Sequence, residues 1–272
     1  MNSITRRIAA TAAVAGVAIA LSGCAPASGT ADAEGGDTIR VGALATPAGD
    51  ILEFVSENLA DDAGLTIEFT EFTDYNTPNI ALSDGSIDAN LFQNDTFLAT
   101  YNDSVGASLV SVGEAYLPSG AFYSDTIGDV DELKDGATVA IPNDPTNEGR
   151  ALGILAAAGL IETTANPTVL SDITSNPRGL EFVEIENATL PQAVADVDAA
   201  FVTVSFALPA GLTADQAILV EGADSDYVNV LATTEELEGD PRVQKLYELL
   251  LDPQTTAFIE ETWGGLVVPV AS

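Results

Sequence analysis

Residues 141–150, with the sequence IPNDPTNEGR, run from a predicted strand straight into a predicted helix. Asp144 is suited to cap this helix, and Pro145 fits its first turn because the N–H that proline lacks has no helical partner there. Gly159 is placed to end the helix. The residues that recur at helical spacing and predict a buried stripe are Ala151, Ile154, Leu155 and Ala158. We therefore predict a strand-to-helix junction of the kind that carries ligand sites in α/β proteins.

Arg150 stands one residue before this stripe, on a helix whose N-terminus is electropositive. An isolated arginine on a surface is ordinarily paired with acids for solubility. Only six basic residues remain in the chain once the N-terminal leader described below is removed. One of those six at a strand-to-helix junction is better explained as a fork for a carboxylate. The sequence therefore predicts that Arg150 binds the carboxylate of a small ligand.

Strand-like and helical stretches alternate on both sides of the junction. The predicted strands are residues 39–44, 65–69, 87–92, 138–141, 180–185 and 199–202. This alternation predicts an α/β fold with a mostly parallel sheet. The chain could cross between two lobes around residues 109–124 and return near residues 227–231. Residues from Pro241 onward are predicted to be helical, with Asp240 as the N-cap.

The N-terminus has the order of a secretory signal: Arg6 and Arg7, an uncharged run at 8–21, then LSGC at 21–24. That run is shorter than the roughly 20 residues that span a membrane, so residues 1–23 are predicted to be a removed signal peptide. LSGC resembles a bacterial lipobox, which predicts lipidation of Cys24, and two acyl chains anchor a protein stably. Residues 24–37 are small and polar and are predicted to form a flexible tether.

Composition excludes several classes of function. Removal of residues 1–23 takes away two of the eight basic residues and none of the 42 acidic ones, which leaves a net charge of −36. Such a chain repels nucleic acid. The sequence contains no histidine and one cysteine, which excludes Ser-His-Asp and Cys-His catalysis and most zinc sites. We therefore predict a protein that is not an enzyme and that uses no cofactor and no metal.

Short segments spread over nearly the whole mature chain resemble the NlpA-type methionine-binding lipoproteins of bacterial ABC importers. In chain order these segments are FTDY at 72–75, TPN at 77–79, DGSIDAN at 84–90, FQ at 92–93, IPNDPTNEGRAL at 141–152, AGLI at 158–161, DI at 172–173, NP at 176–177, LP at 190–191, DVDAA at 196–200 and YVN at 227–229. So many matches in the same order make the resemblance specific to this family.

The resemblance implies a two-lobed periplasmic-binding-protein-like fold of type II, with the ligand in the interlobe cleft. Residues 38–120 and 231–272 would form lobe 1, and residues 121–230 would form lobe 2. The implied ligand is methionine, and the implied partners are the permease and ATPase of an ABC importer. The protein would be a monomer, anchored by lipid at the extracytoplasmic face of the cell membrane.

Carried over residue by residue, the resemblance makes Arg150 the carboxylate clamp, with Asn147 and Asn229 as polar groups that position the ammonium or carboxylate. The aromatic residues expected around the thioether side chain are Tyr75, Phe92 and Phe97, and the family usually has tyrosine at the last of these. Sulfur favours aromatic edges by roughly 0.3–1.5 kcal/mol.

Two further expected ligand-binding positions depart from the family. Asn94 stands where the family usually has histidine, and Thr203, in a predicted strand at 201–207, stands where it has asparagine. Thr203 keeps a hydroxyl and loses both amide donors. The ligand could therefore be another apolar amino acid, a D-isomer or a short peptide. An alternative from another class is a surface adhesion or interaction protein that keeps the fold without transport.

Overall fold

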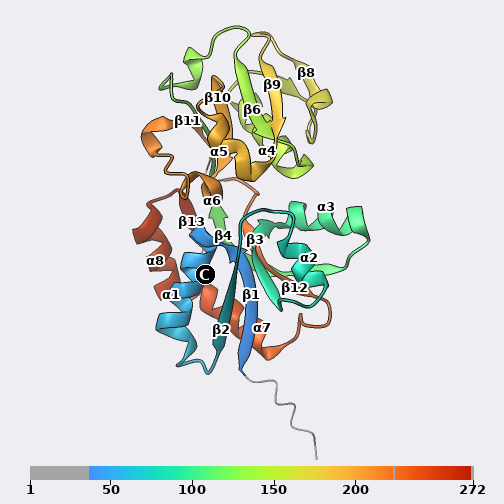
Figure 1. The fold of residues 1–272 in the computed structure, drawn as a ribbon, viewed down its shortest axis with the longest axis vertical. Coiled ribbons are helices and arrows are strands. Elements are labelled where there is room, and N and C mark those ends of the chain that lie inside the picture. The colour runs from blue at the N-terminus through green and yellow to red at the C-terminus, as the bar shows by residue number, and fades with distance from the viewer. Residues whose placement is uncertain (1–36, 223, 271–272) are drawn as a thin grey trace, which may run out of the picture. The chain divides into compact units, whose positions relative to one another are not determined.

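The computed structural model of the chain describes residues 37–222 and 224–270, which fold around two separate mixed sheets (Figure 1). The first sheet has six strands in the order β13-β4-β12-β3-β1-β2. Its strands are β1 Thr38–Leu44, β2 Thr66–Phe72, β3 Ala89–Asn94, β4 Leu109–Pro118, β12 Asn229–Thr234 and β13 Val267–Pro269. We call this sheet with its helices the first lobe.

The second sheet has five strands in the order β11-β5-β10-β6-β9, and we call it with its helices the second lobe. Its strands are β5 Gly120–Tyr123, β6 Thr138–Pro142, β9 Glu181–Ile185, β10 Ala199–Thr203 and β11 Ala217–Val220. A separate two-stranded ladder consists of β7 Glu162–Thr163 and β8 Ile173–Ser175. The sequence prediction of strands near residues 138–141, 180–185 and 199–202 is confirmed.

Helices flank both sheets (Figure 1). Those of the first lobe are α1 Asp50–Val55, α2 Pro78–Ser83, α3 Asp95–Val105, α7 Pro241–Leu250 and α8 Pro253–Trp263. Those of the second lobe are α4 Pro145–Ala157, α5 Leu190–Ala193 and α6 Val204–Ala207. The predicted strand at 201–207 is wrong in its second half, because β10 ends at Thr203 and α6 begins at Val204. An apolar run alone does not distinguish a short buried strand from a short buried helix.

The prediction of a mostly parallel sheet is also wrong. In the first lobe β1 pairs in parallel with β2 and β3, whereas β12 is antiparallel to both β3 and β4. In the second lobe β6 is parallel to β9 and β10, whereas β5 is antiparallel to β10 and β11. Antiparallel neighbours in a sheet need no helical crossover between them. No helix lies between β4 of the first sheet and β5 of the second either.

Two connections join the lobes. Ser119 alone separates β4 from β5, and residues 221–228 lie between β11 and β12. We call these the first and second connections. They fall near the lobe boundaries expected from the family resemblance, although those boundaries stay a prediction.

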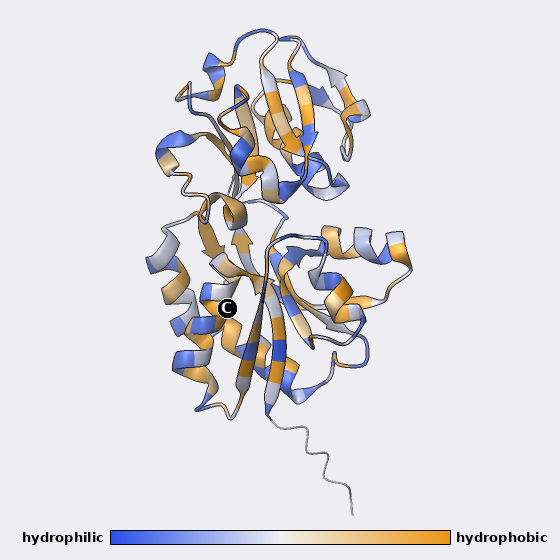
Figure 2. Ribbon diagram, viewed as in Figure 1, coloured by the Kyte–Doolittle hydropathy of each residue, from blue (hydrophilic) through white to orange (hydrophobic). Residues whose placement is uncertain are grey.

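Each lobe has its own apolar core. Ile39, Leu52 and Leu246 belong to a fully buried cluster in the first lobe, and Ile141 and Leu155 to another in the second. Figure 2 shows helices that alternate between hydrophobic and hydrophilic residues, as expected for helices packed on one face. Between residues 37 and 270, no helix that the structure describes is long and apolar enough to span a bilayer.

A further apolar cluster contains residues of both lobes. Tyr75 and Phe92 come from the first lobe, and Val202 and Phe206 come from the second. All four side chains are buried. This shared cluster places the carboxyl end of β3 beside the carboxyl end of β10, and the candidate site lies at this junction.

Candidate functional site

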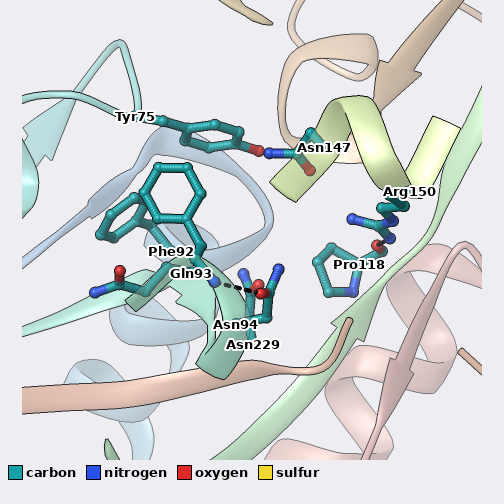
Figure 3. Close-up of a pocket in the computed structure, with 9 residues that line it drawn as sticks. Tyr75, Phe92, Gln93, Asn94, Pro118, Asn147, Arg150 and Asn229 are labelled. Atoms are coloured by element: carbon teal, nitrogen blue, oxygen red, sulfur yellow. Dashed lines mark hydrogen bonds between the residues drawn. The ribbon is translucent and has the colours of Figure 1, made fainter. Parts of the chain in front are cut away.

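A small cavity lies between the lobes, next to the carboxyl end of β3, the first turns of α4 and the start of β12 (Figure 3). Its lining residues are Tyr75, Phe92, Gln93, Asn94, Phe97, Pro118, Asn147, Arg150 and Asn229. The structure thus brings together seven of the eight residues expected at a ligand site. The eighth, Thr203, lies behind Tyr75, whose hydroxyl is 2.9 Å from Thr203 Oγ1.

The strand-to-helix junction forms as the sequence predicts. Asp144 is the N-cap of α4, where its carboxylate accepts a hydrogen bond from the Asn147 backbone N–H at 2.9 Å. The same carboxylate accepts from Asn147 Nδ2 at 3.1 Å and from Asn187 Nδ2 at 2.6 Å. Gly159 follows the helix with a φ of +75°, a left-handed conformation that glycine adopts without strain. This capping holds Asn147 and Arg150 at the cavity.

The opposite wall rests on a buried network of amides. Gln93 Nε2 donates to Asn79 Oδ1 at 2.6 Å and to Asn90 Oδ1 at 2.9 Å. Asn79 Nδ2 donates to Gln93 Oε1 at 2.7 Å, and all three side chains are buried. Because buried amides without partners would cost several kcal/mol in total, this network stabilises one arrangement of β3. It therefore fixes the positions of Phe92 and Asn94, which flank Gln93.

Arg150 is buried and is held by an internal carboxylate. Its Nε donates to Glu221 Oε1 at 2.8 Å, and its Nη2 forms an ion pair with Glu221 Oε2. The same Nη2 donates to the backbone carbonyl of Pro118 at 2.7 Å, and the guanidinium lies 4.8 Å from the ring centroid of Tyr227. Glu221 is the partner that sequence reasoning missed, since nothing in its local sequence distinguishes it from the other acidic residues.

Several polar atoms at the cavity have no hydrogen-bond partner among the described residues. Asn94 uses its Oδ1 to accept from the Phe97 backbone N–H, so its Nδ2 remains a donor. Asn147 and Asn229 use their Nδ2 groups, the latter toward the Tyr116 hydroxyl at 3.1 Å, so their Oδ1 atoms remain acceptors. Arg150 keeps Nη1 as a donor. The cavity thus combines two unused donors with two unused acceptors.

Aromatic rings form the apolar side of the cavity. Tyr75, Phe92 and Phe97 have centroid separations of 5.8 to 6.0 Å. Phe206 approaches the Tyr75 ring to 4.8 Å from the second lobe. Sequence reasoning missed Phe206 because it assigned the residue to a strand. Burial raises the pKa of the Tyr75 hydroxyl above its ordinary value of 10.0, so this group stays neutral and can donate a hydrogen bond.

The cavity volume is about 10 Å³, which is room for about one water molecule. A wider cleft of about 620 Å³ lies on the other side of Arg150, between α3, α4 and the second connection. Thr96 and Thr100 of α3 face Thr146 of α4 in this cleft, and the Thr100 and Thr146 hydroxyls are 3.4 Å apart. The small cavity has no room for an amino acid in this arrangement of the lobes.

Glu148 is a buried carboxylate one turn from the cavity. Its side chain is 1% exposed, and its Oε1 has no partner among the described residues. Burial and the nearby Glu184 raise its pKa from 4.5 to about 7. In residues 37–222 and 224–270 there is no cluster of three or more acidic, cysteine or histidine side chains that could hold a metal ion. Cys24 lies outside the described residues.

Comparison of the sequence with known proteins identifies the family. The profile of the family described as NlpA lipoprotein matches residues 39–271. The D-methionine-binding lipoprotein MetQ of Salmonella typhimurium is 38% identical over 254 residues, which cover 91% of this chain and 92% of that protein. Lipoprotein 28 of Escherichia coli is 34% identical over 276 residues, with 99% of each chain covered.

Comparison with solved structures gives the same family relationship. A nutrient binding protein from Burkholderia cenocepacia bound to methionine matches with a TM-score of 0.82 and 34% identity, over 85% of this chain and 99% of that one. A periplasmic substrate-binding protein of an ABC transporter from Coxiella burnetii matches with a TM-score of 0.82 and 37% identity, over 85% and 100%. The predicted binding-protein fold is confirmed, as is the prediction of a binding protein and not an enzyme. The chain belongs to the NlpA lipoprotein family.

Proposed function

We propose that this protein captures methionine, or a close relative of it, and delivers it to an ABC importer. The observation that carries the proposal is the set of unused groups at the cavity: two donors, two acceptors and a wall of three aromatic rings. An amino-acid zwitterion offers a carboxylate to the donors and an ammonium to the acceptors. An apolar side chain suits the rings, and a thioether gains a further 0.3–1.5 kcal/mol or so from aromatic contact.

In this proposal each polar end of the ligand meets a particular pair of atoms. The carboxylate would accept from Arg150 Nη1 and Asn94 Nδ2, and the ammonium would donate to the Oδ1 atoms of Asn147 and Asn229. Tyr75, together with the two phenylalanines of the wall, would surround the side chain. Thr203 would act indirectly, because its hydroxyl bonds Tyr75. Threonine at position 203, in place of the asparagine usual in the family, would then change the position of the Tyr75 ring.

Ligand capture would require the lobes to open and close. The 10 Å³ cavity is too small for an amino acid, and it shares Arg150 with the 620 Å³ cleft beside it. Separation of α3 from α4 would join the two spaces. Closure over the ligand would then bury its side chain. This cycle is a hinge movement that a permease could detect and that an ATPase could reverse.

The names of the relatives support the same role. Those from Salmonella and Burkholderia are described as a D-methionine-binding lipoprotein and as bound to methionine, and the Coxiella protein is described as part of an ABC transporter. Acylation of Cys24 would hold the protein at the extracytoplasmic face of the cell membrane. Its negative charge repels anionic lipid headgroups, so the acyl chains would have to provide the attachment.

Calorimetric titration of ligand-free protein with L-methionine, D-methionine and other amino acids tests the proposal. We expect saturable binding of methionine, with a Kd in the micromolar range or below. Arg150→Ala should raise that Kd by tenfold to a hundredfold, because it removes a charge-assisted hydrogen bond that contributes about 1.5–3 kcal/mol. Arg178→Ala is the matched control, because the Arg178 side chain donates, among the described residues, only to the backbone carbonyls of Asp131 and Leu133 in the second lobe.

Either of two results would contradict the proposal. The first is a wild-type protein that binds neither methionine isomer. The second is an Arg150→Ala variant with wild-type affinity. Tighter binding of another apolar amino acid or a methionine dipeptide would keep the transport role and change the ligand.

A further inference from the structure

The ion pair between Arg150 and Glu221 is the most deeply buried one in the described part of the chain. The two side chains are 3% and 6% exposed, whereas every other ion pair there includes an arginine that is at least 25% exposed. A buried ion pair often adds little net stability, because desolvation opposes the attraction of the charges. Its presence beside the candidate site therefore suggests a role other than stability.

Glu221 receives four hydrogen bonds on its two carboxylate oxygens. Oε1 accepts from Arg150 Nε at 2.8 Å and from Ser225 Oγ at 2.8 Å. Oε2 accepts from the Gly120 backbone N–H at 2.9 Å and from Arg150 Nη2. Only a group that accepts on both oxygens can satisfy all four donors. A glutamine at this position would turn its NH₂ toward at least one donor, so the charge and the shape of Glu221 are both required.

These contacts fasten Arg150 to both connections between the lobes. Pro118 and Gly120 flank the first connection, and Glu221 and Tyr227 belong to the second. The two connections also bond to each other, since the Glu221 backbone N–H donates to the Gly120 carbonyl at 2.9 Å. The guanidinium of Arg150 is thus held at the point where the chain crosses between the lobes.

We propose that Glu221 is a positioning residue for the ligand carboxylate. By occupying Nε and Nη2 of Arg150, it orients the guanidinium and leaves Nη1, which has no partner among the described residues, for a ligand in the small cavity. The ligand then meets a donor that is already in place and does not have to order a mobile side chain. This inference rests on the proposed amino-acid ligand, and it adds a specificity determinant that touches Arg150 and not the ligand.

Glu221→Gln, assayed with two ligands in the full-length protein, tests the inference. L-methionine carries the carboxylate, whereas L-methionine amide keeps the ammonium and side chain and lacks that charge. We expect Glu221→Gln to raise the Kd of methionine about tenfold and to change the Kd of the amide less than about twofold. Asp88→Asn is the matched control, because it disrupts the Arg40–Asp88 ion pair at the opposite end of β3. It should change neither Kd.

Three results would overturn the inference. An equal loss for both ligands would mean that Glu221 only maintains the fold. Tighter methionine binding would mean that it competes with the ligand for Arg150. Unchanged binding of both ligands would mean that Arg150 needs no positioning. Failure of the proposed function would give a different result, because the wild-type protein itself would then bind no methionine.

Ser225→Ala provides a second variant if Glu221→Gln does not fold. It removes one donor to Glu221 Oε1 and leaves the ion pair in place. We expect a rise of about threefold in the Kd of methionine and none in that of the amide. Equal effects on the two ligands, or no effect on either, would overturn the inference.

Discussion

Replacement of Glu148 by glutamine is expected to stabilise the protein at pH 8 and to change its stability much less at pH 5. Glu148 is 1% exposed, its Oε1 has no partner in the described part of the chain, and Glu184 and Asp144 add negative charge nearby. These features raise its pKa to about 7 from an ordinary value of 4.5. The folded state therefore binds the Glu148 proton more tightly than the unfolded state does.

The sign and size of the effect follow from linkage. Unfolding releases this proton between pH 4.5 and about 7, so stability falls as the pH rises through that window. The full difference between the two pKa values corresponds to about 3 kcal/mol. Glu184 is exposed, and solvent screens its charge, so we expect about 2 kcal/mol. Glutamine is neutral at all these pH values and avoids the loss.

Urea unfolding of wild-type protein and Glu148→Gln at pH 5 and pH 8 measures the difference. Comparing the variant with wild type at the same pH cancels the effect of the general repulsion among the many acidic residues. Glu162→Gln changes an exposed glutamate of the same lobe, and its effect should be alike at the two pH values. A Glu148→Gln effect that is the same at pH 5 and pH 8, or a variant less stable than wild type at pH 8, would refute the reasoning.

Three further substitutions test the packing around the site and along α4. Thr203→Val removes the 2.9 Å hydrogen bond to the Tyr75 hydroxyl and should lower the free energy of unfolding by about 1 kcal/mol. A variant that unfolds at the same temperature as wild type would contradict this. Gly149→Ala would place a Cβ 2.1 Å from the Pro167 carbonyl oxygen and should cost about 1–3 kcal/mol in urea unfolding. Gly153 lies on the same helix, and a Cβ there would meet no atom within 4 Å. Gly153→Ala should therefore raise the free energy of unfolding by up to about 1 kcal/mol.

Local sequence signals predicted the parts of the fold that depend on neighbours in the chain. Asp144 and Asp240 cap α4 and α7 as predicted, because an aspartate before proline and an apolar stripe satisfies free N–H groups whatever surrounds the helix. The buried strand before α4 was also predicted from its own residues. Such features need little information from elsewhere in the chain.

Features that depend on distant residues were not predictable in the same way. Glu221 lies 71 residues from Arg150 in sequence and is one of 42 acidic residues, so no local pattern marks it as the partner. The antiparallel strands next to the two connections depend on how the lobes are joined, which alternation of strands and helices does not reveal. The convergence of Asn147 and Asn229 was expected only through the family resemblance, because their own sequence context gives no distance between them.

The single residue Ser119 between β4 and β5 restricts how the lobes can move. Its backbone N–H donates to Leu266 of the first lobe, and its carbonyl accepts from Val204 of the second, at 3.0 Å each. Such a short link cannot lengthen, so the lobes can turn about it but cannot slide apart there. Turning opens the widest gap far from the pivot, on the side of α3 and α4. A solute would therefore approach between these two helices and reach the aromatic rings through the gap that their separation leaves.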